Sequence, residues 1–189
     1  VEFAGNPAWY AVQALPSMSL PINDNAISWA AAYYTNSLAS YMANAQPKIK
    51  TVFDAWKSQG GTKETFLSNL EKNQDVKNIL LEESPWLLEA TSETEQMKRI
   101  ATLFNLNNIQ NKNITALTKL KDLQLIDGSW AWYKGMQGSR YITSYIVETL
   151  ARLSKLTGNA LDGDALTMQQ NAFNFLHQEA LSEYKNASK

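Results

Sequence analysis

Carboxylates are the side chains of this sequence that could most readily do chemistry. Five of them gather in one stretch, namely Glu82, Glu83, Glu89, Glu93 and Glu95. Two carboxylates held about 6.5–9.5 Å apart would suit an inverting glycosidase. These glutamates share no obvious helical face, and several fall where helix caps and first turns are expected. A solvated surface is therefore the favoured interpretation of the cluster.

Other kinds of catalytic or metal site are weakly represented. His177 is the single histidine, and a lone histidine near the apolar face of a helix is more often a packing or edge residue than a general base. Asp162 and Asp164 fit a helix N-cap better than an acidic catalytic motif. We find no Ser/His/Asp arrangement, phosphate-binding loop or set of metal ligands. The sequence therefore predicts no catalytic residue, no metal and no cofactor.

The composition narrows the classes of function further. The chain has no cysteine, which excludes disulfides, thiolate zinc sites and cysteine nucleophiles. Seventeen basic and eighteen acidic residues nearly cancel, so the charge indicates no nucleic-acid partner. No apolar run approaches the roughly 20 residues of a membrane span. The 189 residues suffice for a hydrophobic core, and we expect residues 1–189 to form one domain of a larger protein.

Helices are the elements that must position these residues. Apolar side chains recur at spacings of three and four along nearly every segment, and no segment alternates like a strand. The clearest helix runs from Tyr141 to Thr157, with Gly158 as its C-terminal stop. Another runs from the candidate N-cap Asp24 to Ala45, and further helices are expected between residues 49 and 104. The sequence predicts an all-α fold, arranged as an array of helical hairpins.

The helical spacing also predicts which side chains are buried. The faces expected on the last three helices are Ile114, Leu117, Leu120 and Leu123, then Ile142, Tyr145, Ile146, Thr149, Leu150, Leu153 and Leu156, then Leu166, Phe173, Leu176 and Ala180.

The most distinctive motif lies between two expected helices and reads Asp127-Gly128-Ser129-Trp130-Ala131-Trp132. Asp can accept a hydrogen bond from its own backbone in an Asx turn, and Gly tolerates a positive φ, so a tight turn is predicted. Trp130 and Trp132 would then wedge between successive hairpins. A platform that stacks a sugar or another ligand is the less favoured alternative. Asp-Gly-x-Trp at such a turn resembles the turns of α/α-toroid proteins, which include terpenoid cyclases and complement-type thioester domains.

Several further blocks, in the same order, resemble the thioester-domain region of bacterial α2-macroglobulins. The likeness covers most of residues 6–156. The blocks are Asn6–Pro16, Tyr33–Ala39, Leu70–Asn73, Lys77–Trp86, Ser92–Gln96, Asp127–Met136 and Ser139–Thr143. The resemblance implies an α/α-toroid, which is expected to be partial because the thioester domains of the family are longer than this chain. An incomplete toroid would leave an open apolar edge that favours dimerisation.

The sequence departs from this family at the reactive residues. The loop of the family carries Cys-x-Glu-Gln, in which the Cys thiol and the Gln side chain close an internal thioester. Counting back from Tyr33 and Tyr34, Asn25 stands at the Cys position and Ser28 at the Gln position. Neither residue can form that bond, and the chain has no cysteine elsewhere, so thioester capture is excluded.

Aromatic residues next to this loop suggest a contact surface. Trp29 and Tyr33 are four residues apart and share a helical face, and Tyr and Trp are frequent anchors of protein interfaces. With the thioester gone, the loop around residues 21–28 could remain a surface for protein contacts. The favoured alternative is that both rings pack inside the toroid or against a neighbouring domain.

Three functions follow as hypotheses. The resemblance implies first a non-catalytic domain of a bacterial α2-macroglobulin-like protein. That protein would be an endopeptidase inhibitor that traps proteases sterically, without a thioester, in the periplasm or cell envelope. It would be exported, with a lipid anchor as a further option, and its partners would be proteases and other domains of the same chain. The second hypothesis is a cell-envelope scaffold that binds other proteins. The third is an enzyme acting on polysaccharide, which would need two convergent carboxylates beside exposed tryptophans.

Overall fold

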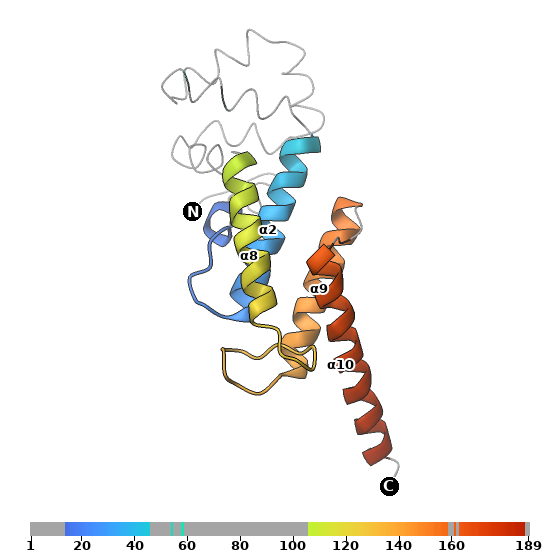
Figure 1. Ribbon diagram of the computed structural model, residues 1–189. Helices are drawn as coiled ribbons and strands as arrows, with labels where there is room; N and C mark the ends of the chain where they lie inside the picture. Colours follow the sequence, from blue (N-terminus) through green and yellow to red (C-terminus); the bar gives the residue numbers. More distant parts are fainter. Residues whose placement is uncertain are drawn as a thin grey trace, which may run out of the picture. The chain divides into compact units, whose positions relative to one another are not determined.

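The described part of the protein is helical. Its elements, in order, are α2 (Ala26–Ala45), α8 (Leu106–Asp122), α9 (Arg140–Thr157) and α10 (Gly163–Ala187) (Figure 1). This computed structural model describes residues 14–45, 54, 58, 106–158, 161 and 163–187, and no strand occurs among them. The predicted all-α fold is confirmed, whereas the toroidal arrangement stays a prediction. The glutamate cluster and most of the expected helices between residues 49 and 104 lie outside the described residues.

The chain divides into two compact units, and the boundary falls within α2 and within α8. The first unit comprises Val1–Met18 and Ala39–Gln110, and the second comprises Ser19–Leu38 and Asn111–Lys189. In the described part of the first unit, residues 14–18 are helical, and the buried side chains are those of Leu15, Ala39 and Ile109. The organisation of residues 1–189 as a single domain stays a prediction.

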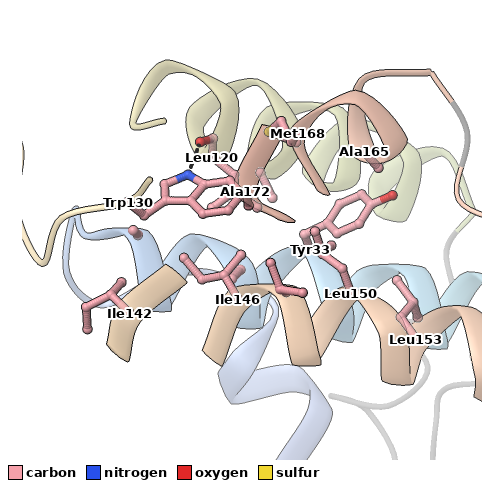
Figure 2. Close-up of a cluster of buried hydrophobic side chains, with 14 of the residues drawn as sticks. Tyr33, Leu120, Trp130, Ile142, Ile146, Leu150, Leu153, Ala165, Met168 and Ala172 are labelled. Carbon is pink, nitrogen blue, oxygen red and sulfur yellow. Dashed lines mark hydrogen bonds between the residues drawn. The ribbon is translucent and has the colours of Figure 1, made fainter. Parts of the chain in front are cut away.

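The second unit is built around one hydrophobic core to which all four helices contribute. A row of α9 side chains runs along one side of this core, and the rings of Trp130 and Tyr33 face it (Figure 2). Fully burying a side chain of the size of Leu or Ile stabilises a fold by about 1.5–3 kcal/mol. The core consists of Ala26, Ala30, Ala32, Tyr33, Ala116, Leu120, Trp130, Ile142, Ile146, Val147, Leu150, Leu153, Ala165, Met168 and Ala172.

Helix α2 contributes mainly small side chains to this core. It contains no charged residue, and its alanines 26, 30 and 32 are at most 1% exposed. Small residues on one helix leave room for large ones from its neighbours, as dense packing requires. A hydrogen bond of 3.1 Å from the Ser37 hydroxyl to Asn113 Oδ1 joins α2 to α8. None of the helices in the described ranges is long and apolar enough to cross a membrane.

Helices α9 and α10 form an antiparallel pair. Ser139 caps the start of α9, where its Oγ accepts a hydrogen bond of 3.4 Å from the Ile142 amide. Gly158 ends α9 with a φ of 66°, as a C-terminal glycine predicts. The chain then returns along α9, the two helices are in contact, and Arg140 at the start of α9 pairs with Glu183 near the end of α10.

The buried face predicted for α9 is partly right. Ile142, Ile146, Leu150 and Leu153 are buried as expected. Tyr145 and Leu156 are exposed instead, and Thr143 and Val147 are buried in their place. On α8, Leu120 is buried as predicted, Leu117 is half-buried and Ile114 is exposed, and Leu123, just after the helix, is half-buried.

The buried face predicted for α10 is wrong at most positions, although Leu176 is half-buried against the core as predicted. The helix buries Ala165, Met168 and Ala172, while Leu166 and Phe173 are 40% and 53% exposed. Both sets of residues have helical spacing, so periodicity cannot choose between them. The turn at Gly128 lies against the main chain of Asn171 so closely that a Cβ atom would not fit. The small side chain of the next residue, Ala172, suits this close approach.

Candidate functional site

The start of α2 holds the two positions aligned with the thioester residues. Asn25 is 7% exposed, and its Oδ1 accepts a hydrogen bond of 2.8 Å from the main-chain N–H of Ser28. This contact between residues i and i+3 is that of a helix N-cap. Asn25, and not the predicted Asp24, therefore caps α2. Asn25 and Ser28, the two aligned positions, thus contact each other through a capping hydrogen bond.

Asp24 has a different role, because it holds the indole of Trp29. Its Oδ1 accepts a hydrogen bond of 2.6 Å from Trp29 Nε1, and Trp29 is half-buried against the core. Tyr33, one turn further along α2, is 7% exposed and is part of the core. The structure thus has Tyr33 in the packing position that the sequence favoured. A partner contact by Trp29 stays a prediction.

The loop before Asn25 is fixed at Ser19. The Asn36 amide donates a hydrogen bond of 2.9 Å to the Ser19 carbonyl oxygen, and Lys112 Nζ donates one of 3.2 Å to the Ser19 hydroxyl. From this anchor the chain runs over the surface, where Leu20 and Ile22 are 58% and 92% exposed. The surface offered by this loop is therefore aliphatic, whereas the aromatic residue Tyr33 is buried in the core.

A second candidate site is the turn between α8 and α9. Asp127 Oδ1 accepts a hydrogen bond of 2.9 Å from the Ser129 amide and one of 2.6 Å from the Ser129 hydroxyl, which makes an Asx turn. Gly128 has a φ of 88°, a region that is strained for other residues. Oδ1 of Asp127 thus accepts both hydrogen bonds of the turn.

Trp130 ties this turn to two helices. Its indole Nε1 donates a hydrogen bond of 2.9 Å to the Leu120 carbonyl of α8, drawn in Figure 2. Its amide donates to Thr143 Oγ1 of α9 at 2.9 Å, and its carbonyl accepts from the Ser139 amide at 2.9 Å. Gln124 adds the third helix, because its Nε2 donates to the Met168 carbonyl of α10 at 2.9 Å.

Beyond Trp130 the chain forms a closed, exposed loop. The hydrogen bond between Trp130 and Ser139 closes its neck, and residues 132–137 are all exposed. The prediction that Trp132 wedges between hairpins is wrong, since Trp132 is 47% exposed. Tyr133 and Met136 are 44% and 54% exposed beside it. The loop presents large apolar side chains on a backbone that is fixed at both ends.

The remaining candidates are not brought together into a site. His177 is exposed on α10, Asp162 lies outside the described residues, and Asp164 forms an exposed ion pair of 2.8 Å with Lys121. The hydrogen bond and charge of Glu183 raise the pKa of Arg140 above its ordinary value. The contact joins α9 to α10 and leaves the charge of Arg140 unchanged. Among the described residues, no cluster of three or more His, Cys, Asp or Glu side chains could hold a metal ion.

Three residues that complete the turn, Ser139, Thr143 and Gln124, were not predicted from the sequence. Ser139 had a usable signal, because a serine directly before an apolar-periodic run predicts an N-cap. Thr143 and Gln124 had none, since the bonds by which they join the turn to α9 and α10 involve the Trp130 amide and the Met168 carbonyl, which lie 13 and 44 residues away.

These features define an all-α protein with a rigid turn that joins three helices and an exposed apolar loop beside it. No family model matches the chain, and neither a curated protein nor a solved structure matches it. The relationship to the α2-macroglobulins therefore stays a prediction from the sequence blocks.

Proposed function

We propose that this chain is a non-catalytic domain of an α2-macroglobulin-like endopeptidase inhibitor that encloses proteases without bonding to them covalently. The observation that carries the proposal is the contact between Asn25 and Ser28. A domain of this type that had kept covalent capture would need a thiol at the first position and a carboxamide at the second. Here the first residue caps a helix, which typically stabilises a protein by about 1 kcal/mol.

Without a covalent bond, the protein must retain its target by enclosure and by surface contacts. Leu20 and Ile22, next to Asn25, offer exposed apolar surface at the loop where the family would bond its target. Apolar side chains of this kind strengthen association by removing their area from water. The proposed partners are proteases and other domains of the same protein, and the proposed compartment is the periplasm or cell envelope.

The experiment uses the full-length protein that contains this chain, mixed with trypsin or elastase. Residual protease activity is measured on a small chromogenic peptide and on a large protein substrate. Enclosure predicts that activity on the small peptide persists while activity on the large substrate falls. Prior treatment with methylamine, which cleaves thioesters, serves as the control and should change neither activity. Unchanged activity on both substrates would remove the trapping proposal for these proteases.

A cell-envelope scaffold is the second candidate, favoured by the exposed loop. Trp132, Tyr133 and Met136 belong to the residue types enriched at interfaces, and the closed neck lowers the entropy that the loop would lose on binding. The test compares recovery of envelope proteins by the wild-type chain and by a variant with these three residues changed to Ala. A partner that binds the wild type and is lost from the variant supports the scaffold, and equal recovery contradicts it.

A further inference from the structure

Helix α10 carries a stripe of exposed residues on the side away from the core. The stripe consists of Leu166, Phe173, His177 and Tyr184, all exposed. At 3.6 residues per turn each residue advances about 100°, so the four lie within about 20° of one line along the helix. Successive members are seven, four and seven residues apart. The stripe extends along roughly 27 Å of helix at 1.5 Å per residue.

This spacing reads the same in both directions along the helix. In an antiparallel pair of α10 helices related by a two-fold axis near residue 175, Leu166 lies opposite Tyr184 of the second copy. Phe173 lies opposite His177 of the second copy. Every exposed ring or aliphatic group of the stripe therefore meets another member of the stripe, as an isologous interface requires.

The surroundings of the stripe also suit association with an identical surface. Residues 165–178 contain no Asp, Glu, Lys or Arg, so two copies meet without like charges facing each other across this stretch. Depletion of charge together with exposed aromatic residues is typical of the centre of an interface. A surface without charge gains nothing from an acidic or basic partner, which favours a second copy as the occupant.

The exposed area of the stripe determines the expected affinity of the dimer. Phe173 and Tyr184, 53% and 74% exposed, together offer roughly 250 Å² if a fully exposed ring presents about 200 Å². With Leu166, His177 and their neighbours, two copies would bury on the order of 1,000 Å² in total, which is at the lower end for a specific complex. The expected dimer is therefore weak, with a Kd of about 10–100 μM.

We propose that this chain forms a two-fold symmetric homodimer through antiparallel pairing of α10 along the stripe of Leu166, Phe173, His177 and Tyr184. The inference goes beyond the proposed function and does not depend on it. It identifies a self-association surface on the second unit.

The first test measures the molar mass of the full 189-residue chain by sedimentation from about 5 to 500 μM, a range that brackets the expected Kd. The wild type should rise from monomer to dimer across this range. Phe173→Lys should remain monomeric, because it places two like charges near the two-fold axis, each opposite His177 of the second copy. Ile114→Lys, at a position 65% exposed on α8, is the matched control and should dimerise like the wild type. A wild type that stays monomeric, or a Phe173→Lys chain that dimerises normally, overturns the proposal.

The second test determines the direction of pairing and does not rely on a disruptive variant. Since the chain has no cysteine, Leu166→Cys and Tyr184→Cys each introduce a single thiol. Under mild oxidation the antiparallel pair predicts a disulfide between the two variants when they are mixed, at least tenfold more abundant than either self-linked product. Dominant self-linking of Leu166→Cys would mean parallel pairing and would reject the proposed interface.

Discussion

All three polar atoms of Trp130 are hydrogen-bonded while its side chain is fully buried. A buried donor or acceptor that loses its partner costs about 1–3 kcal/mol, so each of these bonds matters more than its net contribution suggests. Two of the partners, Thr143 and Ser139, belong to the start of α9. The orientation of α9 against α8 therefore depends on Trp130 and on the turn that positions it.

Gly128 should be the least replaceable glycine of the turn. Gly128→Ala combines a positive φ with an overlap between the new Cβ and the main chain of Asn171, so we expect a loss of about 2–4 kcal/mol in the free energy of unfolding. Gly135→Ala is the control, because its φ of 86° is nearly the same and open space surrounds it. It should lose only about 1 kcal/mol. Urea denaturation of both variants gives the comparison, and equal losses would mean that the approach to α10 is not tight.

Thr143 should stabilise the protein through its hydroxyl group. Its Oγ1 donates to the Ser139 carbonyl at 2.8 Å and also accepts from the Trp130 amide. Thr143→Val keeps the shape and leaves that amide without a partner, so a loss of about 1–3 kcal/mol is expected. Thr149 makes the same bond to the carbonyl four residues back, at 2.8 Å, but accepts nothing from Trp130. Thr149→Val should change the free energy of unfolding by less than about 0.5 kcal/mol, and a Thr143→Val variant as stable as that control would contradict the assignment.

The sequence predicts the residues of the turn better than their partners. Asp and Gly are typical of tight turns, so the Asx turn at Asp127 and the positive φ of Gly128 can be expected from these two residues alone. Trp130 and Trp132 have the same type and lie two residues apart, yet one is buried and the other is exposed. The buried indole donates to the Leu120 carbonyl of α8, a contact ten residues away that no local pattern reveals.

At the scale of the elements, caps place the helices and packing decides which face is buried. Helical spacing and the glycine after α9 predict the length of that helix to within one residue. The buried face of α10 could not be predicted, because Ala165, Met168 and Ala172 are small or flexible. They are less hydrophobic than Leu166 and Phe173. Close approach of the turn favours small residues there, and this is a tertiary constraint that outweighs the hydrophobic pattern.

The cap of α2 gives a prediction at the same scale. Asn25→Ala removes the acceptor of the Ser28 amide and should lower the free energy of unfolding by about 1 kcal/mol. Asn25→Ser keeps a side-chain oxygen of the kind preferred at an N-cap and adds no charge beside Asp24. That variant should stay within about 0.5 kcal/mol of the wild type. Thermal denaturation of both variants measures the effect, and a loss of equal size in Asn25→Ser would show that Asn25 is not acting as a cap.

For the molecule as a whole, apolar packing outweighs charge. The net charge is −1, and two ion pairs that join helices in the described part of the chain, Lys121 with Asp164 and Arg140 with Glu183, are exposed on both sides. Exposed pairs contribute about 0–1 kcal/mol and weaken in salt. The stability of the second unit should therefore follow its buried side chains, which are unevenly distributed along the helices.

This uneven burial predicts the pattern of hydrogen exchange. In α9, buried residues recur from Ile142 to Leu153, whereas in α10 no side chain after Ala172 is fully buried. Local opening requires less free energy where fewer apolar contacts are broken. At a protein concentration of about 5 μM, chosen below the expected Kd, the amides of residues 176–186 should exchange at least about tenfold faster than those of residues 146–153, which corresponds to a difference of about 1.4 kcal/mol.

The concentration dependence of that exchange links the fold to self-association. If α10 pairs with a second copy, raising the concentration to about 500 μM, above the expected Kd, should slow exchange in residues 176–186 and leave α9 unchanged. Pairing then supplies to the end of α10 the apolar contacts that the core supplies only up to Ala172. Uniform protection along α10 at the lower concentration would instead mean that the end of the helix is held within a single copy, and the uneven core would not determine local stability.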